Sequence, residues 1–263
     1  MSSTLKKRLA ILLVILVGSV AHAQNYSAFQ EGEWLKYRLH YGFLNASYAT
    51  MKLEKAQIKG KTVYRAIGKG KTTGFASLFF KVDDTYESFF ELDSVRPVYF
   101  KRDIYEGGYT KHIEIDYDFE GNSAKIYNIK DSTSFSLDIH DKIQDILSST
   151  YYLRENFSTE NLEIGDEIPL DMLFDDDGVY DFKLRYLGEE IIKTKFGKVP
   201  CLAFRPLVKS GRIFREQESL TLWVSNDQNR IPVRIQADLR VGSIKADLEG
   251  YNGLKNQFTL IMD

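Results

Sequence analysis

Hydrophobic and polar side chains alternate along most of the chain, most clearly in residues 33–41, 113–119, 180–186 and 233–240. In residues 113–119, isoleucine, tyrosine and phenylalanine occupy every second position, and glutamate or aspartate fills the positions between them. A period of two places successive side chains on opposite faces of a strand. Antiparallel sheets with one buried and one solvated face have this pattern, so the sequence predicts an all-β fold of antiparallel strands.

Turn residues separate the alternating segments. They are rich in glycine, asparagine and aspartate, which accept the backbone angles of tight turns. The clearest turns are Lys59-Gly60-Lys61, Gly107-Gly108, Glu120-Gly121-Asn122, Asp177-Gly178 and Phe196-Gly197-Lys198. Aromatic residues make up 13% of the chain and concentrate in the strands, which favours curved antiparallel sheets, open or closed like a barrel.

One segment has helical spacing instead. From Asp141 to about Glu155, apolar residues recur about three or four positions apart. Asp141 is placed to cap the start of a helix, and the polar run after Asn156 ends it. The sequence therefore predicts one main helix, at residues 141–156.

The segments before and after this helix have similar layouts. Each has a Gly-Lys hairpin, Gly60-Lys61 or Gly197-Lys198, and a later turn in which an Asp/Asn-rich stretch precedes Arg and Pro, 93–98 or 227–233. We predict two similar β-meander halves, residues 24–140 and 157–263, joined by the helix as one structural unit. The alternative is that any two β-meanders look alike at this level of detail.

The first 23 residues are typical of a secretory signal peptide. Lys6, Lys7 and Arg8 precede an apolar run at residues 9–20, and Ala21-His22-Ala23 has a small-x-small cleavage pattern. We therefore expect cleavage near Ala23 and a periplasmic or secreted protein without a transmembrane segment after cleavage, because no later apolar run reaches spanning length. An uncleaved N-terminal segment is the alternative.

Charge and cysteine content narrow the classes of function. The net charge is −2, and the signal segment holds three cations and no acid, so the remaining chain is more acidic still. This argues against nucleic-acid binding, which requires a basic surface. Cys201 is the only cysteine, so no intramolecular disulfide can form. Its apolar neighbours predict a small hydrophobic side chain in a strand, with a reactive thiol as the alternative.

The sequence GKGKTTG, residues 68–74, resembles the end of a phosphate-binding loop. A P-loop requires a glycine five positions before Gly70, where this chain has Arg65, and it lies between a strand and a helix. We interpret residues 68–74 as the place where a strand leaves the sheet, with glycines that permit positive φ.

The next segment is apolar and is either a plug in the core or an exposed lip that contacts a ligand or partner. In the second case we expect the nearby lysine and acids to take part. The candidate lip comprises Phe75, Leu78, Phe79, Phe80, Lys71, Asp84 and Glu87.

The chain lacks the spacing patterns of common catalytic and metal sites. His40, His112 and His140 have no second histidine at metal-ligand spacing, and we expect the first two on the surface and the third at the helix start. No G-x-S-x-G sequence is present. The acids at 175–177 are read as a polar turn rather than a calcium loop, because position 183 is Lys. We predict no catalytic residue, metal ligand or cofactor.

Several phrases of the chain resemble a known bacterial family. They are GKTTGFASLFFKVDDTYESFF, RDIYEGGY, IQDILSSTYYLR and LWVSNDQNRIPVRIQADLRVGSIKADL, within residues 29–252. The family they resemble is the uncharacterised domain of unknown function 3108. The resemblance implies export, an antiparallel β architecture and a Gram-negative envelope. It brings no activity and no catalytic residues.

From these patterns we expect an exported, non-enzymatic periplasmic protein that binds a hydrophobic or lipid-like ligand in the concavity of a curved sheet. One alternative is a structural module of the envelope that binds partner proteins through a strand edge or the lip. A second is a glycan or ester hydrolase that uses two carboxylates in one cleft.

Overall fold

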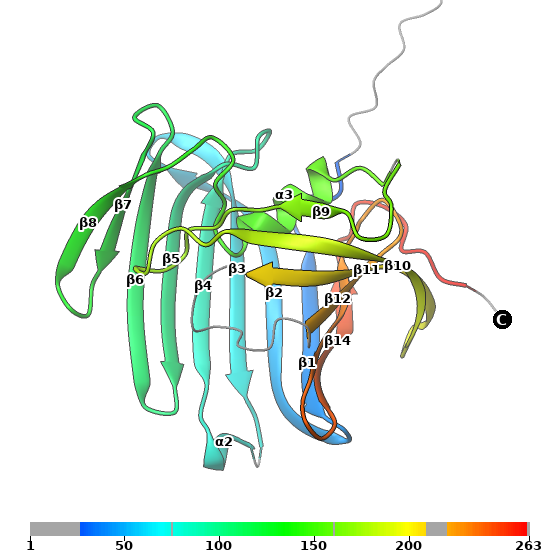
Figure 1. The fold of residues 1–263 in the computed structure, drawn as a ribbon. Helices are drawn as coiled ribbons and strands as arrows, with labels where there is room; N and C mark the ends of the chain where they lie inside the picture. The colour runs from blue at the N-terminus through cyan, green and yellow to red at the C-terminus, as the bar shows by residue number, and fades with distance from the viewer. Residues whose placement is uncertain (1–26, 75, 160, 209–219, 262–263) are drawn as a thin grey trace, which may run out of the picture.

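The computed structural model describes residues 27–74, 76–159, 161–208 and 220–261. The expected signal peptide, residues 1–23, lies outside the described residues. Nearly all regular structure in the described part is antiparallel strand, which confirms the predicted all-β fold, and it forms one large curved sheet (Figure 1).

Within the described residues, the sheet contains fourteen strands in two meanders. The N-terminal meander comprises β1 (Trp34–Tyr41), β2 (Leu44–Ile58), β3 (Lys61–Thr72), β4 (Asp83–Phe90), β5 (Pro97–Glu106), β6 (Tyr109–Asp118), β7 (Ser123–Asn128) and β8 (Thr133–Asp138). The C-terminal meander comprises β9 (Glu167–Pro169), β10 (Phe182–Thr194), β11 (Gly197–Val208), β12 (Leu220–Ser225), β13 (Pro232–Asp238) and β14 (Ser243–Asn252). Two helices complete the described elements, α2 (Ala76–Phe79) and α3 (Ser148–Asn156).

The two meanders join in the middle of the sheet through β1 and β14. Trp34 lies opposite Asn252, and Tyr41 lies opposite Ile244. The sheet order runs from β8 to β1 and then from β14 to β9, so β8 and β9 are its edges. The two Gly-Lys hairpins join β2 to β3 and β10 to β11.

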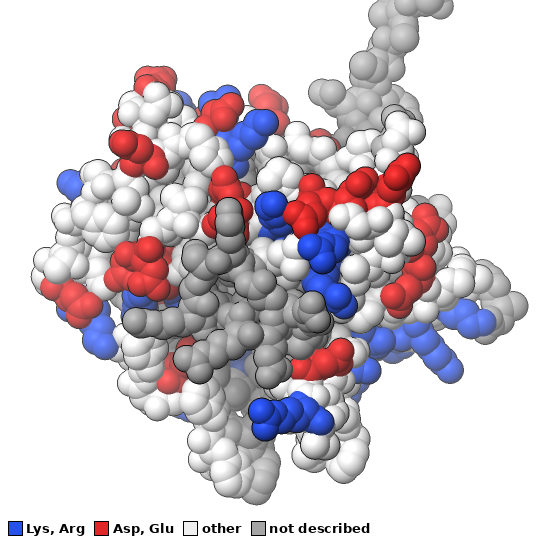
Figure 2. Space-filling model, viewed as in Figure 1, with Lys and Arg blue, Asp and Glu red and all other residues white. Residues whose placement is uncertain are grey.

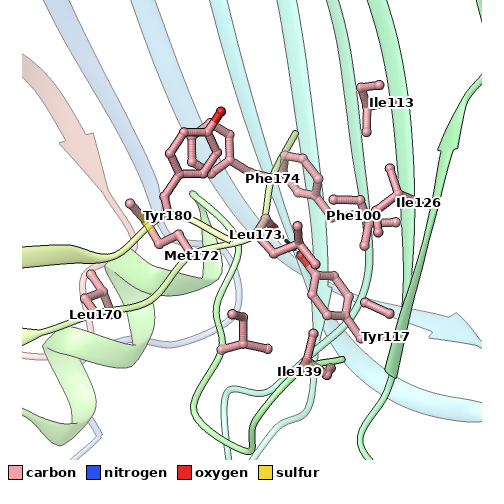
Figure 3. Close-up of a cluster of buried hydrophobic side chains, with 13 residues drawn as sticks. Phe100, Ile113, Tyr117, Ile126, Ile139, Leu170, Met172, Leu173, Phe174 and Tyr180 are labelled. Carbon is pink, nitrogen blue, oxygen red and sulfur yellow. Dashed lines mark hydrogen bonds between the residues drawn. The ribbon is translucent and has the colours of Figure 1, made fainter. Parts of the chain in front are cut away.

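Residues 139–159, which follow β8, and residues 170–180, which follow β9, pack on the inner face of the sheet; together we call them the connecting segment. Its apolar side chains meet those of β5, β6 and β7 in the largest buried cluster (Figure 3). The hydroxyl of Tyr117 donates a hydrogen bond to the carbonyl oxygen of Leu173 within this cluster. Burial of so many apolar side chains fixes the connecting segment against the N-terminal meander.

Helix α3 covers the middle of the sheet. Leu147 and Tyr151 pack against Phe29, Leu53 and Phe90 in a second buried cluster. Aromatic rings meet edge to face here, with the centroids of Phe29 and Tyr151 4.9 Å apart. Such pairs add to the free energy gained by burial.

Helix α3 begins at Ser148, so the predicted start at Asp141 is wrong. Residues 141–147 form turns that place Ile143 in the core. The buried carboxylate of Asp145 accepts the N–H groups of Leu147 and Ser148, both at 2.8 Å. Asp145 therefore satisfies the first free amides of the helix in place of Asp141.

The glycines of the GKGKTTG sequence lie mainly within β3, which ends at Thr72. Gly74 has a positive φ, whereas Gly68 and Gly70 do not. A Cβ atom on Gly68 would lie 3.2 Å from a side-chain methyl of Leu147. The expected exit from the sheet is therefore later than predicted, and Gly68 gives room to the connecting segment.

The C-terminal tail covers part of the outer face of the C-terminal meander. Phe258 and Leu260 pack against a buried cluster that includes Cys201 and Trp223. Burial raises the pKa of the Cys201 thiol to about 12. The prediction of a small hydrophobic side chain in a strand is confirmed for Cys201.

Candidate ligand-binding cavity

Arg154 fastens the end of α3 to both meanders. Its guanidinium makes two hydrogen bonds to the carboxylate of Glu33, at 2.6 and 2.7 Å. Its Nε donates to the carbonyl oxygen of Asn229 at 2.8 Å. Both charged groups are almost fully buried, so each depends on the other for compensation.

The turn between β12 and β13 holds the same end of the helix. The carboxylate of Asp227 accepts hydrogen bonds from the Ser225 hydroxyl and the Asn229 amide, and its second oxygen accepts the Thr259 amide at 3.0 Å. Arg230, in the same turn, donates from Nη1 to the carbonyl oxygens of Arg154 and Phe157. The turn thus joins the helix, the sheet and the C-terminal tail.

A cavity of about 140 Å³ lies between α3 and the inner face of β10–β13. The helix and the chain after it contribute one wall, and alternate residues of the strands contribute the floor. The lining residues are Thr150, Leu153, Arg154, Phe157, Ile168, Leu184, Phe204, Leu222, Val224, Arg230, Pro232 and Ile235.

The cavity is lined mainly by apolar side chains, with two guanidinium groups at its boundary. Arg154 is paired with Glu33, whereas burial lowers the pKa of Arg230 despite the nearby acids Glu155 and Asp227. An apolar ligand would bury its surface here, and an anionic group on it would meet positive charge near Arg230.

The inner face of the N-terminal meander is occupied by the connecting segment. At one end of that meander, Arg102 and Lys111 form ion pairs with Asp175, and Lys111 also reaches Asp176. The amide of Asn128 donates to Asp176 at 2.8 Å. The acids at 175–176 therefore hold the connecting segment in place.

A wider hollow of about 500 Å³ lies over β4, β5 and β6. Its lining includes the charged or polar side chains of Asp83, Asp103, His112 and Lys130. Most of these side chains alternate with the inward-facing residues of their strands, so they belong to the outer face. A polar outer hollow suits an apolar ligand less well than the smaller apolar cavity.

Two buried acids have raised pKa values. Burial raises the pKa of Asp145 to about 6, although Ser88 and two backbone amides donate hydrogen bonds to its carboxylate. Burial also raises the pKa of Asp84 to about 6. Neither acid lines the apolar cavity. The carboxylate of Asp145 accepts a hydrogen bond from the Leu147 amide at the start of α3, and that of Asp84 accepts one from the Tyr105 amide.

The structure separates the residues of the predicted lip. Leu78, Phe79 and Phe80 are exposed at α2, which favours the exposed lip over the core plug. Phe75 lies outside the described residues. Lys71 pairs with Asp83, at 3.1 Å. The two acids are engaged elsewhere: Asp84 is buried, and Glu87 binds Arg65.

His40 and His140 differ from their expected positions. His40 is buried, with Nε2 2.8 Å from the Asp247 carboxylate, so its placement on the surface is wrong. Asp247 of β14 also forms an ion pair with Arg234 of β13, so His40 lies beside this pair of charged side chains. His112 is partly exposed beside Glu114, and His140 contacts Asp171. His140 precedes the turns rather than the helix itself.

The sequence pattern missed most of the cavity. The alternation in 180–186 correctly places Leu184 on the inward face. Phe157 lies just after the predicted helix, and no pattern in the sequence identifies it as a lining residue of the cavity. The signal available in the sequence was the run of inward apolar residues in β10–β12. It does not reveal how much of that face α3 leaves uncovered.

Comparison with known proteins gives a family and a fold. A family model described as "Protein of unknown function (DUF3108)" matches residues 36–249, so the chain belongs to this family. No curated protein matches the sequence. A β-barrel-like protein of the domain of unknown function DUF1849 from Brucella abortus is similar in structure, with a TM-score of 0.53 and 10% identity over 85% of this chain and 98% of that chain.

A second solved structure is more distant. It is a candidate lipoprotein from Parabacteroides distasonis, with a TM-score of 0.33 and 10% identity over 86% of this chain and 98% of that chain. Among the described residues, no helix has the length and apolar character needed to cross a membrane. The first likeness agrees with the curved sheet described above.

Proposed function

We propose that this member of the DUF3108 family is an exported, non-enzymatic protein of the envelope that binds a hydrophobic or lipid-like ligand between α3 and β10–β13. The observation that supports the proposal is the cavity of about 140 Å³, which is lined mainly by apolar side chains. A void of roughly 150 Å³ lined by aliphatic and aromatic side chains stays dry and accepts benzene. A ring or a short alkyl segment therefore fits this space.

The surroundings of the cavity favour an amphipathic ligand. Leu184, Phe204 and Leu222 present apolar surface from three neighbouring strands. Arg230 lies at the same cavity and is half-buried, and burial lowers its pKa. A carboxylate or phosphate attached to the apolar group would relieve the cost of burying this cation.

Native mass spectrometry of the purified chain, followed by organic extraction, tests the proposal directly. We expect an apolar species bound in stoichiometric amount. The fluorescent probe 1-anilinonaphthalene-8-sulfonate, which carries an apolar ring system and an anion, should bind the extracted protein and be displaced by the recovered species.

A matched pair of variants locates the site. Leu222→Trp places a larger side chain in the cavity and should abolish probe binding, whereas Ile191→Trp changes an exposed residue of β10 and should leave it unchanged. A chain that carries no ligand and binds the probe equally in both variants contradicts the proposal. Thermal unfolding of each variant shows that the fold is retained.

A further inference from the structure

Seven large apolar side chains are exposed at one end of the sheet. They lie in the connections β1–β2, β3–β4, β7–β8 and β13–β14, which share this end because neighbouring strands are antiparallel. We call them the apolar rim: Phe43, Leu78, Phe79, Phe80, Ile129, Leu239 and Val241. Phe43 is 90% exposed, Leu78 78% and Val241 76%. In Figure 2 this lower end is covered mostly by uncharged side chains.

Contacts join several of these connections to their neighbours. The hydroxyl of Tyr41 donates to the carbonyl oxygen of Val241 at 2.9 Å, which ties β1–β2 to β13–β14. The Thr73 amide donates to the Ala46 carbonyl oxygen at 3.3 Å, which ties the β3–β4 connection to β2. The Phe80 ring lies against Gly107, where even a Cβ would clash. These contacts join the β1–β2 connection to β13–β14, and the β3–β4 connection to β2 and β5–β6.

Cations accompany the apolar side chains. The described residues between the strands here, β5–β6 included, contain Lys81, Lys130 and Arg240 and one acid, Asp131, whereas three further acids adjoin them at the strand ends: Asp83, Glu106 and Asp238. Two of the cations flank aromatic rings: Lys81 Nζ lies 5.2 Å from the Tyr105 centroid, and Lys130 Nζ lies 5.9 Å from that of Tyr109. Aromatic and aliphatic tips beside lysine and arginine are typical of surfaces that enter the headgroup region of a bilayer.

We propose that the apolar rim docks this protein on the surface of a lipid bilayer that contains anionic lipids. The rim side chains lie on the tips of separate hairpins and form no enclosed groove, so they suit a deformable, planar partner. The cations lie within the connecting tips and can meet anionic headgroups, while the adjoining acids lie further back, at the ends of the strands. This inference rests on the rim alone and is independent of the proposed cavity.

Vesicle co-sedimentation tests the inference, with vesicles of phosphatidylethanolamine and phosphatidylglycerol compared with phosphatidylcholine alone. The protein should begin at Gln24, because the apolar residues before it would bind vesicles by themselves and all described elements lie after it. We expect the wild type to sediment with the anionic vesicles and to bind less well at high salt.

The triple variant Phe43→Ser/Leu78→Ser/Val241→Ser should lose at least about a hundredfold in vesicle affinity, because each buried side chain contributes about tenfold or more. The matched control, Ile164→Ser/Ile191→Ser, removes exposed isoleucines away from the rim and should bind like the wild type. Wild-type protein that stays in the supernatant overturns the inference. So does equal loss in the control, or a rim variant that changes only the oligomeric state.

Discussion

The two ends of the sheet use the same kind of connection for different purposes. The apolar rim exposes large hydrophobic side chains, whereas the opposite end has none among the described residues of its five hairpin connections. There Val95 and Ile231 point inward and are buried, and the charged residues balance, four of each sign. Tight turns therefore do not require exposed apolar side chains, and the rim needs another explanation.

The opposite end is also where the fold is fastened. Arg154 binds Glu33 and Asn229 there, and Asp227 joins the β12–β13 turn to the C-terminal tail. The side chains of the rim mainly face solvent, so they contribute less to the stability of the fold. The comparison predicts that substitutions at the fastened end change folding and substitutions at the rim change binding.

The largest effect is expected at Arg154. Arg154→Met leaves the Glu33 carboxylate buried without its partner, and the free energy of unfolding should fall by about 3–5 kcal/mol. Urea unfolding followed by tryptophan fluorescence measures this change. The double variant Glu33→Leu/Arg154→Met should recover much of the loss. A loss below about 1 kcal/mol for the single variant would show that this pair does not fasten the helix.

The start of the same helix should respond to pH. Burial raises the pKa of Asp145 in the folded chain to about 6, above the ordinary value near 4, so the folded state holds the proton more tightly than the unfolded state. The contribution to stability is therefore greatest below about pH 4, declines by about 2–3 kcal/mol as the pH rises to about 6, and is constant above.

Asp145→Asn provides the control, because an amide keeps the acceptor for the helix amides and does not titrate. The difference in unfolding free energy between the wild type and this variant should change over that pH range. A difference that is independent of pH would show that the hydrogen bonds from Ser88 and the two amides outweigh burial.

Two glycines of β3 offer a smaller and sharper test. Gly68→Ala forces a Cβ against Leu147 and should destabilise the fold by about 1 kcal/mol. Gly70, two residues closer to the rim, has no atom within 4 Å of a new Cβ, so Gly70→Ala should be neutral or slightly stabilising. Equal effects in thermal unfolding would contradict the packing of the connecting segment on β3.

The smallest effect on stability is expected at the rim. The triple variant Phe43→Ser/Leu78→Ser/Val241→Ser should unfold within about 0.5 kcal/mol per substitution of the wild type, because these side chains are exposed. The same urea titration measures it. A large loss of stability would mean that the rim is part of the core packing and would remove the contrast between the two ends.

The strands could be predicted because each depends on its own alternation. Ile113, Ile115 and Tyr117 all face the core as the period of two requires. The helix start was misplaced because Ile143 belongs to a turn, where an apolar residue can be buried without helical geometry. The spacing of apolar residues indicates which positions are buried. The start of the helix is set instead by the hydrogen bonds that Asp145 accepts from the first helix amides.

The cavity and the rim depend on relations between distant segments. His40 was placed on the surface because its face of β1 alternates as polar, yet Asp247 of the neighbouring strand covers it. Phe157 and Ile235 line one cavity although they lie far apart in the sequence. The pairing of β1 with β14 brings His40 beside Asp247, and the packing of α3 on the sheet brings Phe157 near Ile235; no local pattern contains either relation.

That same pairing sets the order in which the protein can be completed. The first strand finds its second neighbour only in residues 243–252, so the centre of the sheet cannot close until nearly the whole chain is available. Pairing of such distant segments slows folding. Until it forms, β1 has an edge without a neighbouring strand. A chain that emerges from a ribosome would therefore expose this strand edge until residues 243–252 follow, and chaperones protect such incomplete states.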